Sequence, residues 1–262
     1  MKKRILLTGL GVLFLVISLM NSSYAIDPQT IIGEWHFDDG SGKTVKDSSG
    51  NGNDGSLVGD TEWVDGKSGK ALLFDGQNDC VTMAIDRDIP DEYTLSAWIY
   101  QESEAQSPGD DGDYGQTILS SSNVSGNYSF WLLSYRGEQI RFYAFETAPA
   151  VANSLLTNDK VISLQQWHHI AATAVKGGDS VIYVDGEEKA RMDNKGLETT
   201  STGYFVGDLR VDRQIAFNGV IDEVTVFDVA LSPADVTVLT RGGEAVSSRG
   251  KLAVTWGLVK NQ

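Results

Sequence analysis

Apolar and polar residues alternate along much of the chain with a period of two, which is the pattern of half-buried β-strands. In the stretch 93–100, Leu95, Ala97 and Ile99 fall on one face, and Trp98 falls on the opposite face. Short runs of this kind recur with turn residues between them, and no longer repeat is present. We therefore expect an all-β fold made of two packed antiparallel sheets.

Further strands follow from the same pattern. They span residues 31–37, 71–74, 80–83, 116–120, 128–134, 139–146, 167–175, 180–184, 188–192, 203–207 and 217–227. Asp75-Gly76 and Asp185-Gly186 each separate two of these runs, and Asp-Gly is favoured in the tight turns of β-hairpins. We expect a hairpin at both places. The polar segment 46–59 reads as a series of turns.

One short helix is expected near the C-terminal end. Ser232 can accept a hydrogen bond from a free backbone N–H, Pro233 suits the first helical position, and Asp235 favours the positive end of the helix dipole. Gly242-Gly243 would end the helix. The predicted architecture is a two-sheet antiparallel jelly-roll sandwich with one short C-terminal helix.

The first residues have the features of an export signal. Lys2, Lys3 and Arg4 precede the apolar stretch 5–20, and Ser23-Tyr24-Ala25 fits a signal-peptidase site. The alternative is an uncleaved anchor, but 16 helical residues span only about 24 Å of a hydrocarbon core about 30 Å thick. We expect a secreted or cell-surface protein with no stable membrane insertion after cleavage. Its parts would be a signal peptide (1–25), one domain (26–241) and a C-terminal tail (242–262).

Charge and cysteine content exclude several classes of function. The net charge is −15 and the sequence pI is about 4.5, whereas nucleic-acid binding requires cations that replace phosphate counterions. Nucleic acid is therefore not expected as a partner. The single cysteine, Cys80, excludes an intramolecular disulfide and a cysteine-based zinc site. It lies in a strand-like run, so we expect a buried thiol.

Several short runs together resemble one known family. They are Trp35-His36-Phe37, 47–52, 71–76, 94–98, 167–171, 182–186, 217–224 and Ala230-Leu231-Ser232. In this order they resemble the LamG-like jelly-roll domains of the concanavalin A-like lectin/glucanase group, over about residues 31–240. The resemblance implies a two-sheet jelly roll used outside the cell for carbohydrate binding, adhesion or support of an enzyme. Members of this family frequently bind a calcium ion, so the resemblance also implies that this protein could bind one.

A calcium site is a hypothesis for the loop 47–55. Asp47, Asn51 and Asn53 offer the oxygen ligands that calcium prefers, and glycines let backbone carbonyls turn inward. The helix–loop–helix calcium template does not fit, because Val58 stands where a bidentate glutamate is required. The alternative is that these side chains form hydrogen bonds within turns.

Asp222 is the fourth candidate ligand. Uninterrupted alternation places it on one row with Val220, Val224 and Val226, where a bare buried carboxylate would cost several kcal/mol. Either a β-bulge at Asp222-Glu223 moves the side chain or a cation neutralises it. The resemblance suggests that the Asp47 loop and this strand lie together. One structural calcium could then join Asp47, Asn51, Asn53 and Asp222.

No catalytic residues are predicted. The Glu-x-Asp-x-x-Glu strand of laminarinase-like relatives is absent, and the neighbouring carboxylates Asp222 and Glu223 would point to opposite faces. His36, His168 and His169 show no chelating spacing, so we expect structural or surface histidines.

Aromatic residues are the remaining candidates for chemistry, since sugars bind to exposed rings. Those available for a binding surface are Trp63, Tyr100, Tyr114, Tyr128, Tyr135 and Tyr143. Four tryptophans inside strands are assigned to the core, namely Trp35, Trp98, Trp131 and Trp167.

The sequence as a whole predicts a non-catalytic module that binds an extracellular carbohydrate or protein and is stabilised by calcium. Two alternatives stay open. One is a glycan-active enzyme whose catalytic residues escape recognition, and the other is a structural surface or matrix component that assembles through the tail. No sequence signal indicates an oligomeric state.

Overall fold

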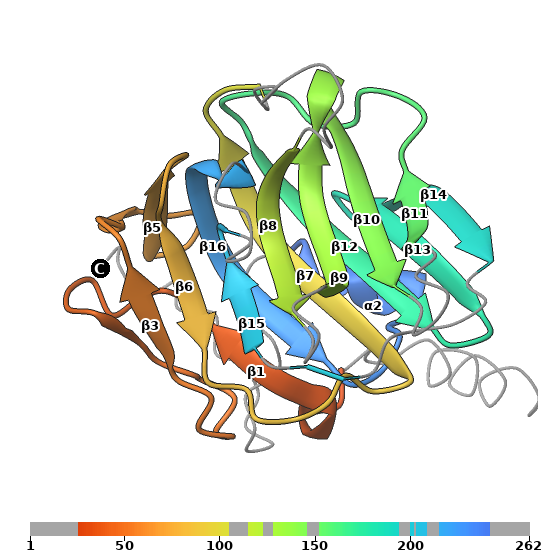
Figure 1. The fold of residues 1–262 in the computed structure, drawn as a ribbon, viewed down its shortest axis with the longest axis horizontal. Helices are drawn as coiled ribbons and strands as arrows, with labels where there is room; N and C mark the ends of the chain where they lie inside the picture. The colour runs from red at the N-terminus through yellow and green to blue at the C-terminus, as the bar shows by residue number, and fades with distance from the viewer. Residues whose placement is uncertain are drawn as a thin grey trace, which may run out of the picture.

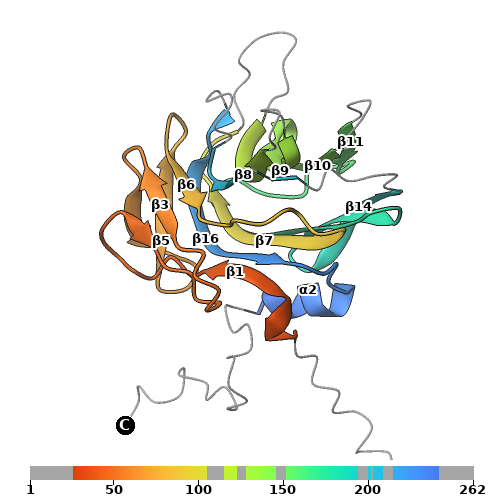
Figure 2. The ribbon, with the colours of Figure 1, turned by 60° about the horizontal axis from the view of Figure 1, so that its bottom comes forward.

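Two antiparallel sheets stacked face to face make up the protein (Figures 1 and 2). The structure is a computed structural model that describes residues 26–104, 115–122, 128–145, 152–193, 200–201, 203–208 and 215–241. Within these residues it contains one short α-helix. The predicted two-sheet sandwich with one C-terminal helix is confirmed. The predicted signal peptide (1–25) and tail (242–262) lie outside the described residues.

The first sheet, sheet A, carries the helix on its outer face. Its strands in order are β14 (Glu187–Asp193), β13 (Asp179–Val184), β12 (Trp167–Val175), β7 (Glu92–Gln101), β16 (Asn218–Phe227), β5 (Lys70–Asp75) and β4 (Glu62–Asp65). Strand β1 (Ile31–Trp35) pairs with the second half of β16, whereas β5 pairs with the first half. Strand β16 is therefore the organising strand of this sheet.

The second sheet, sheet B, faces the viewer in Figure 1. Its strands in order are β11 (Ala152–Leu156), β10 (Gln139–Phe145), β9 (Tyr128–Tyr135), β8 (Gly115–Ser122), β15 (Gly203–Val206), β6 (Cys80–Met83), β3 (Gly55–Val58) and β2 (Thr44–Val45). Two short 3₁₀ turns, η1 (Pro28–Thr30) and η2 (Arg136–Glu138), complete the described elements. Strands β2, β3, β4 and β11 were not expected, because each is short and carries little alternation.

The core fills the space between the sheets. Leu95, Ala97 and Ile99 of β7 enter it together with Trp35 and the buried aliphatic and aromatic side chains of sheet B. Trp98 points to the other face, as the alternation of the sequence predicts. Cys80 is buried with a free thiol, which also confirms the prediction.

Helix α2 (Pro233–Leu239) begins and is capped as expected. The Ser232 hydroxyl oxygen accepts from the Asp235 N–H at 3.3 Å, and Pro233 is the first helical residue. Val236 packs with Phe227 and Tyr183 in a second apolar cluster on the outer face of sheet A. Figure 2 shows α2 lying beneath that sheet. The helix therefore covers one half of the outer face.

Of the two expected hairpins, one is present. Strands β13 and β14 pair through the Asp185-Gly186 turn, where both residues have positive φ (52° and 82°). The prediction of a hairpin at Asp75-Gly76 is wrong, because β5 belongs to sheet A and β6 to sheet B. The Asp79 carboxylate accepts from the backbone N–H of Asp75 and of Asp60. It thereby fixes a connection that crosses from one sheet to the other.

A bulge in β16 changes the expected faces of that strand. The register against β7 shifts between Asp222 and Thr225, and Glu223 adopts φ +50°. Val224 and Val226 therefore enter the core, whereas Val220 does not belong to it. The prediction that Asp222 shares a row with both valines is wrong because the extra residue reverses the alternation. The alternative prediction of a bulge at Asp222-Glu223 is confirmed.

Candidate functional site

The half of sheet A that α2 leaves open carries a continuous row of apolar side chains on its outer face. Leu73 of β5 pairs with Val220 of β16, Val220 with Tyr100 of β7, and Tyr100 with Trp167 of β12. All four side chains are partly exposed. We call these four residues the aromatic row, because its two largest side chains, Tyr100 and Trp167, are aromatic.

Strand alternation explains why these side chains face outward. Three members of the row lie next to a core residue on the same strand, namely Leu72, Ile99 and Ile221, and all three of these are fully buried. The rings of Tyr100 and Trp167 lie 5.7 Å apart between centroids and are tilted by 57°. A contiguous exposed apolar strip of this kind on a folded domain marks a binding surface more often than single exposed residues do.

A second row runs beside the first, nearer to the helix. Asp222 pairs with Trp98, and Trp98 with His169, so that a carboxylate, an indole and an imidazole stand side by side. The Trp98 and His169 rings meet edge to face at 5.4 Å. The Lys67 ammonium lies 4.2 Å from the centroid of the Trp98 ring. Trp98 is only 7 % exposed.

Asp222 is held by backbone N–H groups. Its Oδ2 accepts from Ser68 N–H at 3.1 Å and its Oδ1 from Glu223 N–H at 2.8 Å. Burial nevertheless outweighs these hydrogen bonds and raises the pKa of Asp222 to about 7. The turn that carries Ser68 approaches so closely that a Cβ added at Gly66 would lie 2.6 Å from Oδ2. This carboxylate therefore fixes the β4–β5 turn against β16.

His169 is a neutral, buried histidine. Burial lowers its pKa to about 4, and its Nε2 lies 2.9 Å from the Ser96 hydroxyl oxygen. His168 is also structural: its Nε2 accepts from Ser163 N–H at 3.0 Å, and its Nδ1 lies 2.8 Å from an Asp185 carboxylate oxygen. The prediction of structural histidines holds for both.

His36 is placed differently, between two glutamates at the end of β1. Its Nδ1 lies 2.6 Å from a Glu223 carboxylate oxygen and its Nε2 3.7 Å from Glu34. The hydrogen bond to Glu223 raises the pKa of His36 to about 9, against the opposing effect of burial. Burial raises the pKa of Glu34. Sequence reasoning missed this cluster, because Glu34 and Glu223 meet only through the pairing of β1 with β16.

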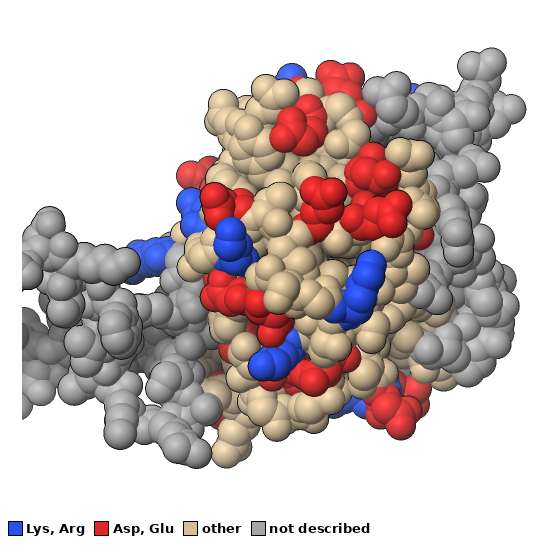
Figure 3. All heavy atoms as spheres, turned by 90° about the vertical axis from the view of Figure 1, so that its left-hand side faces the viewer, with Lys and Arg blue, Asp and Glu red and all other residues tan. Residues whose placement is uncertain are grey.

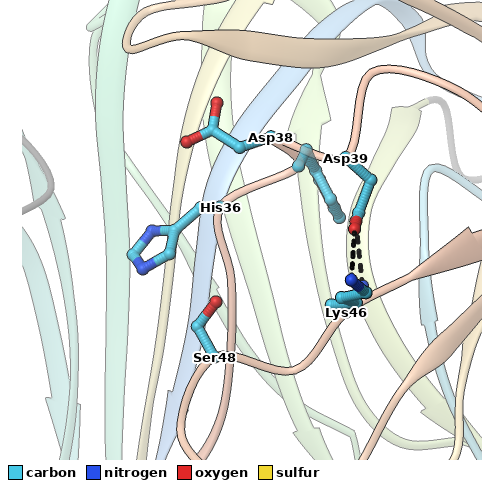
Figure 4. Close-up of a pocket in the computed structure, with 6 residues that line it drawn as sticks. His36, Asp38, Asp39, Lys46 and Ser48 are labelled. Carbon is cyan, nitrogen blue, oxygen red and sulfur yellow. Dashed lines mark hydrogen bonds and ion pairs between the residues drawn. The ribbon is translucent and has the colours of Figure 1, made fainter.

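Next to His36 is a surface hollow of about 430 Å³. Its lining is His36, Phe37, Asp38, Asp39, Lys46 and Ser48. Figure 4 shows Asp38 and Ser48 on either side of His36, and Asp39 joined to Lys46. Phe37 and Glu223 both have positive φ (53° and 50°), a backbone conformation that costs free energy for bulky residues and is concentrated at functional sites.

Three of the predicted calcium ligands lie in one loop. The Asp47 carboxylate accepts from the backbone N–H of Glu34, Ser49 and Asn53. The side-chain amides of Asn51 and Asn53 both donate to the carbonyl oxygen of Ile32, at 3.1 and 2.7 Å. These contacts are those of the hydrogen-bonded turn that we considered as the alternative.

The fourth predicted ligand has different partners. Asp222 contacts Ser68 and Glu223, and none of the contacts of Asp47 described above involves it. Among the described residues, no group of three or more histidine, cysteine, aspartate or glutamate side chains has a geometry suited to a metal. A calcium ion shared by the four residues stays a prediction.

The aromatic assignments need correction. Trp35, Trp98 and Trp131 are buried as expected, although Trp98 and Trp131 lie on the outer faces of the two sheets and not between them. Trp167 is only partly buried, so its assignment to the core is wrong. Among the residues offered for a surface, Tyr100 is half-exposed, whereas Tyr135 and Tyr143 are buried with Trp131 in an outer cluster of sheet B. Tyr114 lies outside the described residues, as does the side chain of Tyr128.

Acidic and basic side chains are mixed on one side of the surface. Figure 3 shows the side of the molecule that carries β3 and β5, where acidic side chains form several groups with lysine and arginine between them. No continuous basic surface is visible on this side. No helix within the described residues has the length and apolar character needed to cross a membrane.

Comparison with known proteins assigns the chain to a family. Residues 75–237 match the family model Laminin_G_3, described as the concanavalin A-like lectin/glucanases superfamily. The chain belongs to this superfamily. The family that the sequence resembles is thereby confirmed. No curated protein matches the chain.

Solved structures of the same fold include several binding domains. Domain 4 of AbnA, an extracellular arabinanase from Geobacillus stearothermophilus, in complex with arabinotriose, is 22 % identical with a TM-score of 0.60, over 80 % of this chain and 98 % of that one. The binding domain of Paraclostridial Mosquitocidal Protein 1 is 17 % identical (TM-score 0.64), over 81 % of this chain and 52 % of that one. The ligand binding domain of botulinum neurotoxin serotype D, in complex with N-acetylneuraminic acid, is 16 % identical (TM-score 0.60), over 82 % and 51 %. The chain thus spans about half the length of the two toxin domains, and these similarities show the fold.

Proposed function

We propose that this protein is a non-catalytic carbohydrate-binding module and that a saccharide lies on the aromatic row of sheet A. The observation that carries the proposal is the partly exposed pair of Tyr100 and Trp167, on an outer sheet face that the helix leaves open. Flat apolar rings match the C–H faces of sugar rings, while polar groups beside them can fix orientation. Structural relatives that hold arabinotriose and N-acetylneuraminic acid support this class of ligand.

The binding test uses the full mature chain and a panel of soluble saccharides that includes arabinotriose, lactose and 3′-sialyllactose. We expect at least one of them to bind by calorimetry. Trp167→Ala and Tyr100→Ala should each weaken that binding by about tenfold or more, as is usual for aromatic hot spots. Phe205→Ala is the matched control, since Phe205 is a half-exposed aromatic on sheet B.

Two outcomes would overturn the proposal. In one, no saccharide of the panel binds, and in the other the Trp167 and Tyr100 variants bind as well as the parent. Release of reducing sugar during the same incubations would instead favour a glycan-active enzyme. The carboxylates beside His36 would then be the first residues to substitute, because Glu34 has a raised pKa and Glu223 lies on the opposite side of the imidazole.

Export is a separate proposal that rests on residues 1–25. Cleavage after Ala25 would place Ile26 at the N-terminus, and Ile26 is buried in the cluster beneath α2. N-terminal sequencing of the protein from the culture medium tests it. A sequence starting at Met1, or protein retained in the membrane fraction, contradicts the proposal.

Calcium is proposed as a structural ion for the loop that contains Asp47, Asn51 and Asn53. The support is the set of oxygen-bearing side chains that the loop gathers beside β1. A thermal melt in calcium against a melt in chelator tests it directly. A midpoint that chelator leaves unchanged refutes calcium without affecting the carbohydrate proposal.

A further inference from the structure

Lys67 is unusual among the lysines that the structure describes. Each of the others reaches an oxygen atom: Lys43 donates to the Gly59 carbonyl, and the rest pair with a carboxylate. The Lys67 ammonium instead rests on the face of Trp98. In a chain with a net charge of −15, an exposed lysine with no carboxylate partner among the described residues requires an explanation.

Carboxylates do lie nearby, but they are committed to other groups. Asp222 accepts from the backbone N–H of Ser68 and Glu223, and Glu223 holds His36 at 2.6 Å. Asp65, on the same turn as Lys67, pairs with Lys70 at 2.7 Å. The Lys67 ammonium therefore keeps its N–H donors available to a ligand.

The turn that carries Lys67 is held in place from two sides. Asp222 accepts from Ser68 N–H on one side, and Asp38 accepts from Lys70 N–H at 2.8 Å on the other. A Cβ added at Gly69 would collide with the Asp38 carboxylate, so the turn requires glycine there. Anchoring of this kind presents the Lys67 side chain at a defined place and lowers the entropic cost of using it in binding.

Lys67 stands directly beside the aromatic row. Trp98, on which it rests, and Tyr100 are two residues apart on the same face of β7, which places them about 7 Å from each other. A sugar ring on Tyr100 and Trp167 would therefore bring a substituent on its near edge within reach of the ammonium. At the far end of the row Glu62 of β4 pairs with Leu73 and is exposed.

We infer that the aromatic row binds a saccharide that carries a single carboxylate, with the sugar ring on Tyr100 and Trp167 and the carboxylate on the Lys67 ammonium. This inference rests on the proposed carbohydrate binding and narrows it to acidic sugars. A polyanionic chain is disfavoured, because Glu62 and the net negative charge of the protein would repel further acidic groups. A charge-assisted hydrogen bond is stronger than a neutral one, so the acidic sugar should bind more tightly than its neutral counterpart.

The test compares matched saccharide pairs on the full mature chain at low salt. One pair is 3′-sialyllactose and lactose, and the other is xylotriose with and without a glucuronic acid substituent. The two pairs distinguish the possible sources of the carboxylate, a sialic acid or a hexuronic acid. We expect the acidic member of at least one pair to bind about tenfold more tightly or better, and the difference to shrink as salt rises.

Substitution of Lys67 then isolates the charge. Lys67→Met keeps the aliphatic stem on Trp98 and should reduce the affinity for the acidic sugar to that of the neutral one, with the neutral sugar changed by less than about twofold. Lys176→Met is the matched control, because Lys176 pairs with Asp91 at the turn between β12 and β13. It should leave both affinities unchanged.

The possible failures are distinguishable. If neutral saccharides bind at Tyr100 and Trp167 but acidic members show no advantage, the carboxylate inference falls and the carbohydrate proposal stands. The same conclusion follows if Lys67→Met weakens both members of a pair equally, since that result indicates a structural role. If no member of either pair binds, the carboxylate inference is wrong, and the carbohydrate proposal falls with it only if arabinotriose does not bind either.

Discussion

The two halves of the outer face of sheet A use similar side chains for different ends. Under α2, Phe227 and Tyr183 are at most 2 % exposed, whereas Tyr100 and Trp167 at the other end of the same sheet stay partly exposed. Burial of apolar surface stabilises a fold by about 25 cal/mol per Å². The covered half therefore contributes to stability, and the open half forgoes part of that contribution and keeps its rings available to a ligand.

The strongest test of this contrast removes a ring from the covered half. Phe227→Ala deletes a fully buried side chain and should lower the free energy of unfolding by about 3–5 kcal/mol. Urea denaturation measures this as a fall in the midpoint with an unchanged slope. A loss below about 1 kcal/mol would mean that the cluster under α2 does not stabilise the protein.

The boundary between the halves contains Asp222, whose pKa of about 7 predicts a stability that falls as pH rises. Between about pH 4 and 7 the folded protein holds a proton that the unfolded chain has released, so each step upward in pH favours unfolding. Relative to Asp222→Asn, the parent should lose about 3 kcal/mol over this range. Urea midpoints of both proteins at pH 4.5 and 8 give the difference, and parallel curves contradict the prediction.

His36 lies at the same boundary and should act at higher pH. Its pKa of about 9 means that the charged imidazole stabilises the fold fully below about pH 6.5, and that this contribution is lost as pH rises through 9. Relative to His36→Gln, the parent should lose about 1–2 kcal/mol between pH 7 and 10. Chemical denaturation at these two pH values measures the loss. If the difference in the free energy of unfolding between the two proteins is the same at both pH values, His36 is uncharged at pH 7.

The smallest effect on stability is expected in the open half. Trp167→Ala should change the free energy of unfolding by less than about 1 kcal/mol, because the ring is partly hydrated in the folded protein. The same urea measurement as for Phe227→Ala applies. A loss comparable to that of Phe227→Ala would remove the distinction between the two halves and assign Trp167 to the core after all.

The candidate site was only partly predictable from the sequence. Alternation placed Trp98 on the face opposite to Leu95, Ala97 and Ile99, where it is buried, but the assignment of Trp167 to the core was wrong. The reason is physical: in a two-sheet sandwich each strand has an outer face, and period-two patterning does not say whether another element covers that face or leaves it open to solvent. The aromatic row depends on the pairing of four strands, β5, β16, β7 and β12, which the sequence pattern does not give.

Asp222 was also only partly predictable from the sequence. The conflict between a carboxylate and an apolar strand indicated either a bulge or a cation, and the bulge is present. One partner of the carboxylate, the Ser68 N–H, comes from a turn more than 150 residues away along the chain. No local pattern could have predicted that contact.

The sequence by itself determined the two-sheet class, most strands, the capped helix and the family, because these depend on periodicity, local capping and short motifs. The tertiary structure decided which sheet each strand joins, which face α2 covers, and that Lys67, Trp98, Tyr100 and Trp167 lie together. Strand order is set by contacts between distant segments. The four side chains come from the β4–β5 turn and from two strands, β7 and β12, that are far apart in the sequence.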